Sequence, residues 1–543
     1  METQTAKKST KLGLISIISL IGAIIALSWS AKNRQNQTIL QAPSETAVEV
    51  ENQATQEFQD IYTQEQLAAA ELLKTDFDKN ASFFSARYNG CFKAKNSIVC
   101  ESLYPEKKIK SHKSKASDWR EAQLKINKLS PKGRKSVRQN LIKSKKCASS
   151  SYLAALAFKT EEELPNKEAL KDALALYEKA FVCAKNDNYE LRGLYRWGLL
   201  SLWAKQNDSA RVAFQTYLKH SEDVNLKSRA QYWLNSMQQQ DGQNISSQDL
   251  KEQWLEFPLS HHLNTQVVNQ NMEPVDFVVQ NTKIRTLNRS ESSQKINNSL
   301  ALFELLQNAG YQELALRTLE FLDFKLLATL EPEVQLHVAL LLNEHDPKQH
   351  NMFMVLSRLF QNHPRYKNLE TLKVFYPTPF KDLILSSKLN QDPALIIALI
   401  RQESSFNTKT VSPVGARGLM QIMPNTAKEM NKRITEKDLL NPDKNIPLGV
   451  RYLRALLREF KGDEHKALAA YNAGAGNVKK WVKRYPVQDP LLFADLIPFD
   501  ETREYITSIL RNRYWYSRLY PEFALDEKIA SAAYSRSTST QSN

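Results

Sequence analysis

Apolar residues recur at steps of three and four positions through most of this 543-residue sequence. Leu170, Leu174, Tyr177 and Phe181 form one such stripe. Residues spaced in this way lie on one face of an α-helix, which is then buried against a neighbouring element. No heptad persists, and prolines interrupt the pattern, so a coiled coil is not expected. The spacing therefore predicts an all-α protein.

Two separated segments look alike and predict helical hairpins. Residues 200–218 read LSLWAKQNDSARVAFQTYL, and residues 302–322 read LFELLQNAGYQELALRTLEFL. Each reads as a helix, a polar turn and a second helix. Hairpins that cannot bury their apolar faces alone stack on their neighbours. We therefore expect an α-solenoid of helical hairpins over residues 81–370, which either positions a long substrate or provides structural support.

A cationic start precedes a long apolar run at the amino terminus. The run from Leu12 to Trp29 approaches the roughly 20 residues that cross a bilayer. Because cationic ends stay in the cytoplasm, residues 1–34 are predicted to anchor the chain in the inner membrane, with the remainder in the periplasm or cell envelope. The small residues around Trp29 also suit a cleaved signal peptide, and this alternative stays open.

Two further segments are predicted to lack a fold of their own. Residues 35–80 are polar and acidic, without Lys or Arg between Gln35 and Leu73, and are predicted to form a tether. The tail over residues 526–543 is rich in Ser and Thr and is predicted to be disordered.

The formal net charge is +15, and much of it lies between Glu101 and Ser150. This segment holds 15 Lys or Arg against four acids. The excess favours a polyanionic partner such as anionic lipid or an acidic wall polymer, although a solvated helix face explains it equally well. No nucleic acid is expected, because no groove-reading motif accompanies the charge.

The four cysteines all lie in the first third of the chain. An even number in an oxidising compartment permits two disulfides, in the basic part of the predicted solenoid, residues 81–185. We favour Cys91 with Cys100 and Cys147 with Cys183. The sequence leaves other pairings and buried free thiols open.

The sequence texture changes after Tyr376, where YPTPF is followed by a helix start. Asp392 is suited to cap a helix, and Pro393 suits its first turn. Leu399, Ile400 and Glu403 then share one face of that helix. A carboxyl group among apolar side chains has a raised pKa and holds its proton near neutral pH. Glu403 is therefore a candidate proton donor, although an acid at the end of a stripe is more often an ordinary surface residue.

Six of the 14 glycines lie between Gly415 and Gly476. Within SPVGARGLMQIMP, Gly415 and Gly418 allow tight turns, and Gln421 offers both donor and acceptor atoms to a sugar. Met423 supplies an adaptable apolar wall. The segment has the composition of a saccharide cleft, and a simple turn is the alternative for either glycine.

Three helices are expected beyond this loop. One runs from about Pro447 to Phe460, and a short one ends with Tyr471 and Asn472 in AYNAGAG. The last one opens in IPFDETREYI, with Asp500 as the expected cap. Its residues Glu501 and Tyr505 lie one turn apart on the same face.

Four motifs in order carry a resemblance to a known family: IRQESSFN, SPVGARGLMQIMP, AYNAG and IPFDETREYI. Together they resemble the catalytic domain of the soluble lytic murein transglycosylases, here over residues 371–525. The preceding helical region, with FPLSHH and YPTPF, is similar to the superhelical portion of that family. The resemblance implies a C-terminal lysozyme-like catalytic domain, with no metal and no organic cofactor.

The resemblance also implies a role for individual residues. Glu403 matches the catalytic glutamate of the family. The positions that match its substrate-binding residues are Ser412, Gln421, Met423, Tyr471, Asn472, Glu501 and Tyr505. The implied substrate is the glycan strand of peptidoglycan, cleaved without water between N-acetylmuramic acid and N-acetylglucosamine to give 1,6-anhydromuramoyl products.

Other functions stay open on the sequence alone. A lysozyme-type hydrolase would need a second carboxylate. The candidates in this region are Asp443, Asp463, Asp489, Asp495 and Glu501. A non-catalytic wall-binding scaffold is the alternative outside the enzymes.

Overall fold

The structure is a computed structural model, and helices account for nearly all of its regular structure. It describes residues 115–184, 189–278, 324–345, 350–386 and 391–524, with isolated positions between 300 and 322. Only isolated β-bridges occur in this part of the chain, so the all-α prediction is confirmed there. None of its helices combines the length and the apolar character that a membrane crossing requires. The expected anchor, tether and tail lie outside the described residues.

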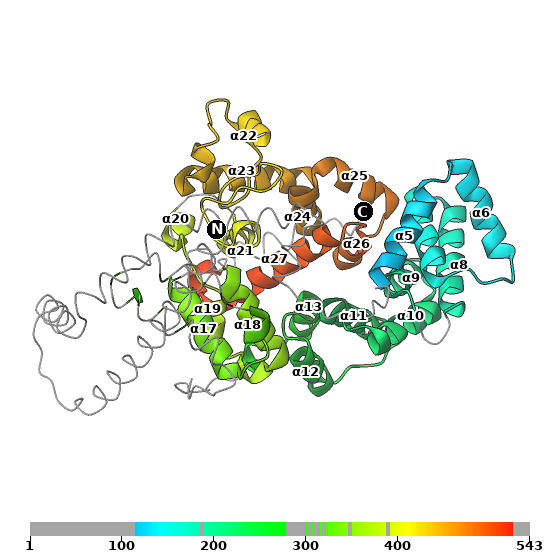
Figure 1. Ribbon diagram of the computed structural model, residues 1–543, viewed down its shortest axis with the longest axis horizontal. Coiled ribbons are helices and arrows are strands. Elements are labelled where there is room, and N and C mark those ends of the chain that lie inside the picture. Colours follow the sequence, from blue (N-terminus) through cyan, green and yellow to red (C-terminus); the bar gives the residue numbers. More distant parts are fainter. Residues whose placement is uncertain are drawn as a thin grey trace, which may run out of the picture. The chain divides into compact units, whose positions relative to one another are not determined.

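Helical hairpins make up the amino-terminal half of the described chain (Figure 1). Each helix from α7 to α10 packs on the next one along the chain. The helices are α5 (Lys115–Asn127), α6 (Pro131–Lys143), α7 (Ser150–Thr160), α8 (Lys167–Val182), α9 (Leu191–Trp203), α10 (Asn207–His220), α11 (Val224–Gln240), α12 (Ser247–Glu256) and α13 (His261–Asn269).

The hairpin expected over residues 200–218 is α9 and α10. Gly198 in α9 lets the ring of Phe214 in α10 approach, because a Cβ at Gly198 would lie 2.6 Å from that ring. Both helices bury their apolar stripes, including Leu194 and Leu199. The similar segment at residues 302–322 is described only at isolated positions, so its hairpin stays a prediction.

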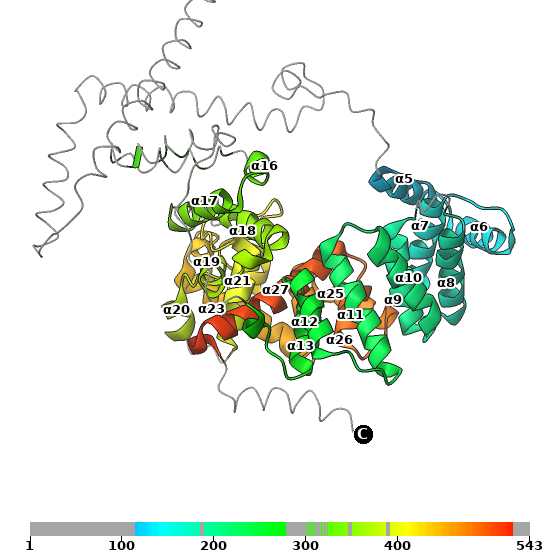
Figure 2. The same cartoon turned by 90° about the horizontal axis from the view of Figure 1, so that it is seen from below.

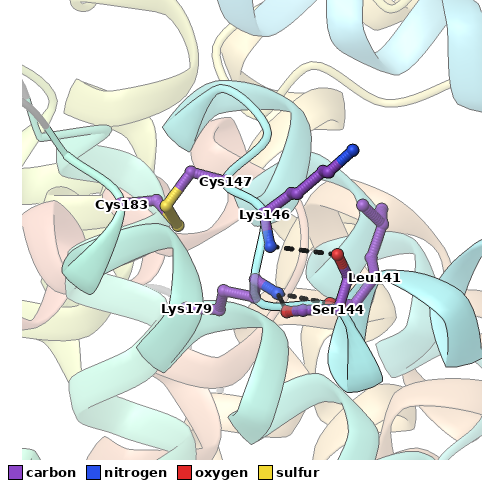
Figure 3. Close-up of a disulfide and its surroundings, with 6 residues drawn as sticks. All are labelled: Leu141, Ser144, Lys146, Cys147, Lys179 and Cys183. Carbon is purple, nitrogen blue, oxygen red and sulfur yellow. Dashed lines mark hydrogen bonds between the residues drawn. A yellow bond between two sulfur atoms is a disulfide. The ribbon is translucent and has the colours of Figure 1, made fainter.

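A disulfide joins the loop after α6 to the end of α8 (Figure 3). Its residues are Cys147 and Cys183, with Cα atoms 5.5 Å apart. This pairing is the favoured one, and Cys91 and Cys100 lie outside the described residues. Lys179 of α8 donates hydrogen bonds to the carbonyl oxygens of Leu141 and Ser144, and so caps the end of α6.

The carboxyl-terminal half is also helical. Its helices are α17 (Pro332–His345), α18 (His350–Asn362), α19 (Leu369–Phe375), α20 (Lys381–Ser386), α21 (Pro393–Ser404), α22 (Pro424–Met430), α23 (Pro442–Glu459), α24 (Glu464–Ala473), α25 (Ala475–Arg484), α26 (Pro490–Leu496) and α27 (Asp500–Leu519). The long helix α27 packs on α21, α24 and α13.

Two expected helix starts are wrong. The helix expected from Pro447 begins at Pro442, because Asn441 accepts a hydrogen bond from the Asp443 amide and Pro442 suits the first position. Pro447 then lies inside α23. Asp500 is the first residue of α27 and not its cap, because its carboxylate pairs with Arg503 one turn ahead.

The chain divides into two compact units. One holds residues 112–287 and 331–543, and so nearly everything described above. The other holds residues 1–111 and 288–330, of which α16 (Phe324–Leu327) and isolated positions are described. Within the first unit, α13 packs on α27 and α9 packs on α26 (Figure 2). The two halves of the described chain are therefore in direct contact, and the predicted boundary at residue 370 stays a prediction.

Candidate active site

Helix α21 carries Glu403 at the end of a buried apolar stripe. Asp392 caps the helix by accepting a hydrogen bond from the Ala394 amide at 2.9 Å. Leu399 and Ile400 are fully buried. Glu403 lies in the last turn and remains partly exposed. The helix thus places one carboxyl group between the core and solvent.

The surroundings of Glu403 favour its protonated form. Burial, with a smaller contribution from the nearby charge of Glu501, raises the pKa of Glu403 to about 8, although a hydrogen bond from Tyr505 opposes the shift. The hydroxyl of Tyr505 donates that bond to Glu403 Oε1. The carboxyl group therefore holds a proton near neutral pH and, once it has lost it, keeps one fixed donor for its charge.

Tyr471 joins α24 to the loop that follows α21. Its hydroxyl donates to the carbonyl oxygen of Met420 at 2.8 Å. Its ring packs against Tyr452, with centroids 5.1 Å apart. Burial, followed by the charge of Glu403, raises the pKa of both Tyr471 and Tyr505 well above the ordinary value. Both tyrosines are therefore neutral donors.

The loop after α21 has an unusual backbone. Ser405, Phe406 and Gln421 have φ angles of 48°, 67° and 45°, a region that residues with a Cβ rarely occupy. The side-chain nitrogen Nε2 of Gln421 donates to the carbonyl oxygens of Thr410 at 3.1 Å and Gly418 at 2.8 Å. That nitrogen is engaged within the loop, so the amide oxygen is the candidate atom for contact with a substrate.

The other expected binding residues surround this loop or open to solvent. Ser412 accepts a hydrogen bond from the Ala416 amide at 2.9 Å, which closes the turn at Gly415. Asn472 accepts one from Thr502 of α27 at 2.6 Å. Met423 and Glu501 are exposed.

The side chain of Asn445 in α23 forms hydrogen bonds with the backbone of this loop. The sequence analysis did not identify it. Its Oδ1 accepts from the Met420 amide at 2.8 Å, and its Nδ2 donates to the carbonyl oxygens of Arg417 and Leu439 at 3.0 and 2.8 Å. Gly418 makes this contact possible, because a Cβ there would lie 1.9 Å from Leu439 O. No local signal could reveal Asn445, since two of its three partners are more than 20 residues away in the chain.

Arg401 was also missed. It is buried one turn before Ser405, with its guanidinium 4.0 Å from the Phe353 ring centroid, 4.3 Å from that of Phe375 and 4.5 Å from that of Tyr376. It also donates a hydrogen bond to the carbonyl oxygen of Phe375. These contacts anchor the end of α21 that carries Glu403. The aromatic residues around YPTPF are the one sequence signal for such a cage.

Of the five acids considered for a second carboxylate, only Glu501 influences the pKa of Glu403. Asp463 and Asp489 cap α24 and α26. Asp443 is exposed in the first turn of α23. Asp495 is buried and pairs with Arg229, on a different network. Glu501 is therefore the one acid of this set close to the candidate active site.

Within the described ranges, no group of three or more His, Cys, Asp or Glu side chains is arranged to bind a metal ion. A cavity of about 530 Å³ lies elsewhere, beside the Cys147–Cys183 disulfide, and none of the residues discussed around Glu403 lines it.

Residues 384–491 match the family model described as the Transglycosylase SLT domain. The chain contains an SLT domain. Glu403, Gln421 and Tyr471 lie inside the match, and Glu501 and Tyr505 follow it. The SLT domain is thus completed by α27, which supplies the tyrosine that binds Glu403.

Two relatives illustrate the reach of the similarity. The "Soluble lytic murein transglycosylase" of Salmonella typhimurium is 39% identical over 144 residues, which cover 25% of this chain and 22% of that protein. The "Transglycosylase" of Enterobacteria phage PRD1 is 41% identical over 104 residues, covering 19% of this chain and 37% of that protein. The matched part is thus less than half of either relative.

The fold similarity extends beyond the SLT domain. The crystal structure of the 70 kDa soluble lytic transglycosylase of Escherichia coli aligns with a TM-score of 0.51 at 20% identity. The alignment covers 75% of this chain and 62% of that one. The helical region before the SLT domain therefore shares the fold of that protein.

Proposed function

We propose that the chain is a peptidoglycan lytic transglycosylase with Glu403 as its single acid and base. The observation that carries the proposal is the partly exposed Glu403, protonated near neutral pH and bound by the Tyr505 hydroxyl. The SLT domain, and the names of the relatives that share it, support this activity. We assign substrate contacts to Ser412, Gln421, Met423, Tyr471, Asn472, Glu501 and Tyr505.

The reaction needs one carboxyl group in two protonation states. Glu403 first donates its proton to the oxygen between N-acetylmuramic acid and N-acetylglucosamine, and the bond from that oxygen to the muramoyl anomeric carbon breaks. An oxocarbenium-like centre develops, which the acetamide of the sugar can shield. The Glu403 carboxylate then removes the proton of the muramoyl 6-hydroxyl, whose oxygen bonds to the anomeric carbon. The product is a 1,6-anhydro sugar, Glu403 is again protonated, and no water is consumed.

Tyr505 serves both states of Glu403. In the donor state the partly buried carboxyl group is neutral, and desolvation keeps it so. In the acceptor state the Tyr505 hydroxyl donates to the carboxylate and limits the cost of its charge. Tyr471 of α24 donates to Met420 O and so fixes the loop after α21 to α24.

Hydrolysis is the second candidate, because Glu501 is close enough to Glu403 to influence its pKa. A hydrolase would use that second carboxylate to activate water or to attack the sugar. Glu501 is exposed, on the first turn of α27. Its exposure favours a role in binding over one in chemistry.

Product analysis separates the two candidates. Purified cell wall is incubated with the wild type, E403Q and E501Q, and the soluble products are identified by mass spectrometry. We expect anhydro sugars from the wild type, a loss of at least about 100-fold in E403Q, and a smaller loss in E501Q. Reducing ends without anhydro sugars, with E501Q as inactive as E403Q, would establish the hydrolase. Equal product release by E403Q and the wild type would reject catalysis by Glu403.

We also propose the wider organisation expected from the sequence: an anchor over residues 1–34, a tether over 35–80, a solenoid over 81–370 and a lysozyme-like catalytic domain over 371–525. The Cys147–Cys183 disulfide supports export, since such bonds persist in oxidising compartments. Cell fractionation tests the anchor: the full chain should sediment with membranes, and a chain lacking residues 1–34 but exported by another signal should not.

A further inference from the structure

One buried guanidinium holds the face of α27 that points away from Glu403. Arg229 of α11 is 3% exposed. Its Nη2 donates to Glu504 Oε1 at 2.8 Å and to Thr507 Oγ1 at 2.9 Å. Its Nη1 donates to Asp495 Oδ1 of α26 at 3.1 Å. A single side chain from the helical region thus binds two helices of the other half of the unit.

The acceptors of Arg229 are close to the candidate active site along α27. Glu504 directly precedes Tyr505, and Thr507 follows two residues later. Tyr505 donates to Glu403, and Thr502 on the same helix donates to Asn472. Because a helix moves as a rigid element over one or two turns, any shift of residues 504–507 displaces the Tyr505 hydroxyl.

The fork of Arg229 resists such a shift. Its planar guanidinium fixes several acceptors at once, which a point charge does not. Asp495 is itself held in place by Trp233 Nε1 at 2.8 Å and Tyr195 Oη at 3.2 Å. The acceptor of Arg229 on α26 is therefore itself fixed by side chains of the helical region.

We propose that Arg229 is a positioning residue that fixes α27 and thereby holds the Tyr505 hydroxyl on Glu403. The proposal rests on the proposed function, and it extends the catalytic machinery to a residue about 150 positions before the SLT match. Arg229 does not touch substrate. It acts through Glu504 and Thr507.

The pH dependence of the reaction tests this role. Activity requires protonated Glu403 and so declines as pH rises through its pKa. The Tyr505 bond lowers that pKa, so its loss moves the decline to higher pH. We expect R229M to move it by about 0.5 to 1 pH unit and to lower kcat about 10-fold, as Y505F should. R229K keeps the charge without the fork and should fall between R229M and the wild type.

Arg138 offers a matched control. It is also 3% exposed and pairs with Glu163 and Asp172 at 2.9 and 3.0 Å, but these partners do not lie on α27. R138M should lose stability without moving the pH profile. Should R229M fail to fold, the double variant E504M/T507V removes both acceptors of Arg229 on α27. A profile unchanged in R229M, or in the double variant, overturns the proposal, as does an equal shift in R138M.

The outcome is distinguishable from a failure of the proposed function. If the wild type releases no anhydro sugars, the proposed activity is wrong. The hydrogen bond from Tyr505 is then detected through the titration of the Glu403 carboxyl carbon, followed by carbon NMR of Glu-labelled protein. The resonance is assigned with E403Q. An upward shift of its titration in R229M but not in R138M supports the positioning role without any turnover, and equal titration curves overturn it.

An independent observation concerns the charge of α5, α6 and the loop after α6. No acid occurs from residue 122 to residue 160. Three cations of this stretch are paired with acids at its edges or on α8, namely Lys125, Arg138 and Lys159. Seven others form no ion pair with a described residue, and we refer to them as the cationic surface: Lys128, Lys132, Arg134, Lys135, Lys143, Lys145 and Lys146.

The cationic surface is held in place despite its mutual repulsion. The Cys147–Cys183 disulfide and the Lys179 cap fix the loop after α6 (Figure 3). The Lys146 side chain extends away from the disulfide in this view. Leu124 is the one large apolar side chain of residues 118–150 that is exposed, so the surface lacks the aromatic and aliphatic anchors of a membrane-binding helix.

We infer that the cationic surface binds the carboxylates of the peptide stems of peptidoglycan. The inference rests on the proposed function, since it concerns the same polymer that Glu403 would cleave. The surface would keep the enzyme on the wall through electrostatic attraction to many weak sites, as for other polyanions.

Sedimentation with purified wall tests the inference without catalysis. In an E403Q background, the triple change K143Q/K145Q/K146Q should weaken binding by about 10-fold at low salt and flatten its salt dependence. The control K205Q/K219Q/K227Q removes three lysines of the same helical region and should bind as the parent does. Walls whose stem carboxylates have been amidated should bind the parent as weakly as untreated walls bind the first variant.

Other outcomes overturn the inference. Equal binding of the two triple variants to wall would exclude the surface as a wall contact. A difference between them seen only with vesicles of anionic phospholipid, or only with duplex DNA, would assign the surface to that partner instead. Wall binding is measured without catalysis, and the anhydro-sugar assay measures catalysis separately. A failure of this inference can therefore be told apart from a failure of the proposed function.

Discussion

At the residue scale, the decisive property of Glu403 is the balance between burial and one hydrogen bond. Burial raises its pKa to about 8, and the Tyr505 hydroxyl limits the rise. Ionising Glu403 in the folded protein therefore costs more free energy than ionising it in the unfolded chain. A folded chain that must ionise Glu403 is less stable than one that carries a neutral side chain there.

We expect this cost to appear as a pH-dependent stability gap between the wild type and E403Q. Below about pH 4.5 the carboxyl is protonated in the folded and unfolded states, so it has no effect. Between about 4.5 and 8 only the unfolded chain ionises, and stability is lost as pH rises. The free energy of unfolding of E403Q should exceed that of the wild type by roughly 1 to 4 kcal/mol at about pH 8. Denaturant unfolding at several pH values measures the gap, with E429Q at an exposed position as the baseline. A gap that stays constant with pH contradicts the prediction.

At the element scale, the loop between α21 and α22 depends on close backbone approach. Gly418 has a φ of 75° and abuts Leu439 O, while Asn445 binds the Met420 amide from α23. Met420 O then receives the Tyr471 hydroxyl. The shape of this loop therefore follows from a glycine, a buried amide and a tyrosine on three different elements.

Two glycines separate strain from contact in this loop. Gly415 and Gly418 both have positive φ, but a Cβ at Gly415 would meet nothing within 4 Å. G415A should cost about 1 kcal/mol, from the left-handed backbone alone. G418A adds a clash with Leu439 O and should cost at least about 3 kcal/mol, together with most of the activity. Equal unfolding free energies of the two variants would refute the close approach at Gly418.

At the scale of the whole unit, buried polar groups join the helical region to the SLT domain. Asp495 of α26 is fully buried and contacts Arg229, Trp233, Tyr195 and His262, all from the helical region. Its ionised state needs all of that surface to be in place. The two halves should therefore unfold together.

Removing the charge of Asp495 tests this coupling. D495N leaves Arg229 and its neighbours with an incomplete partner and should lower the free energy of unfolding by about 3 to 5 kcal/mol. D489N is the control: Asp489 directly precedes the same helix, and its exposed side chain caps two backbone amides. Asn caps as well as Asp, so D489N should cost less than about 0.5 kcal/mol. Differential scanning calorimetry measures both, and a wild-type chain whose two halves unfold in separate steps would contradict the coupled unfolding.

Several features could be predicted from local sequence because their causes are local. Asp392 and Pro393 start α21, and the spacing of Leu399, Ile400 and Glu403 places an acid at the end of its buried stripe. The hairpin at residues 200–218 follows from its two stripes and polar turn. The start of α23 was missed for a local reason too, since Asn441 and Pro442 form a better start than Pro447.

Only the tertiary structure decided which distant groups meet. Asn445 beneath the loop, Arg401 among three aromatic rings, and Arg229 behind α27 all bind partners that no local pattern specifies. The reason is physical: helix formation is set by neighbours within four residues, whereas the pKa of Glu403 and the position of Tyr505 depend on surfaces that chain folding brings together. The sequence by itself determined a helix that places an acid in its last turn, and packing raised the pKa of that acid.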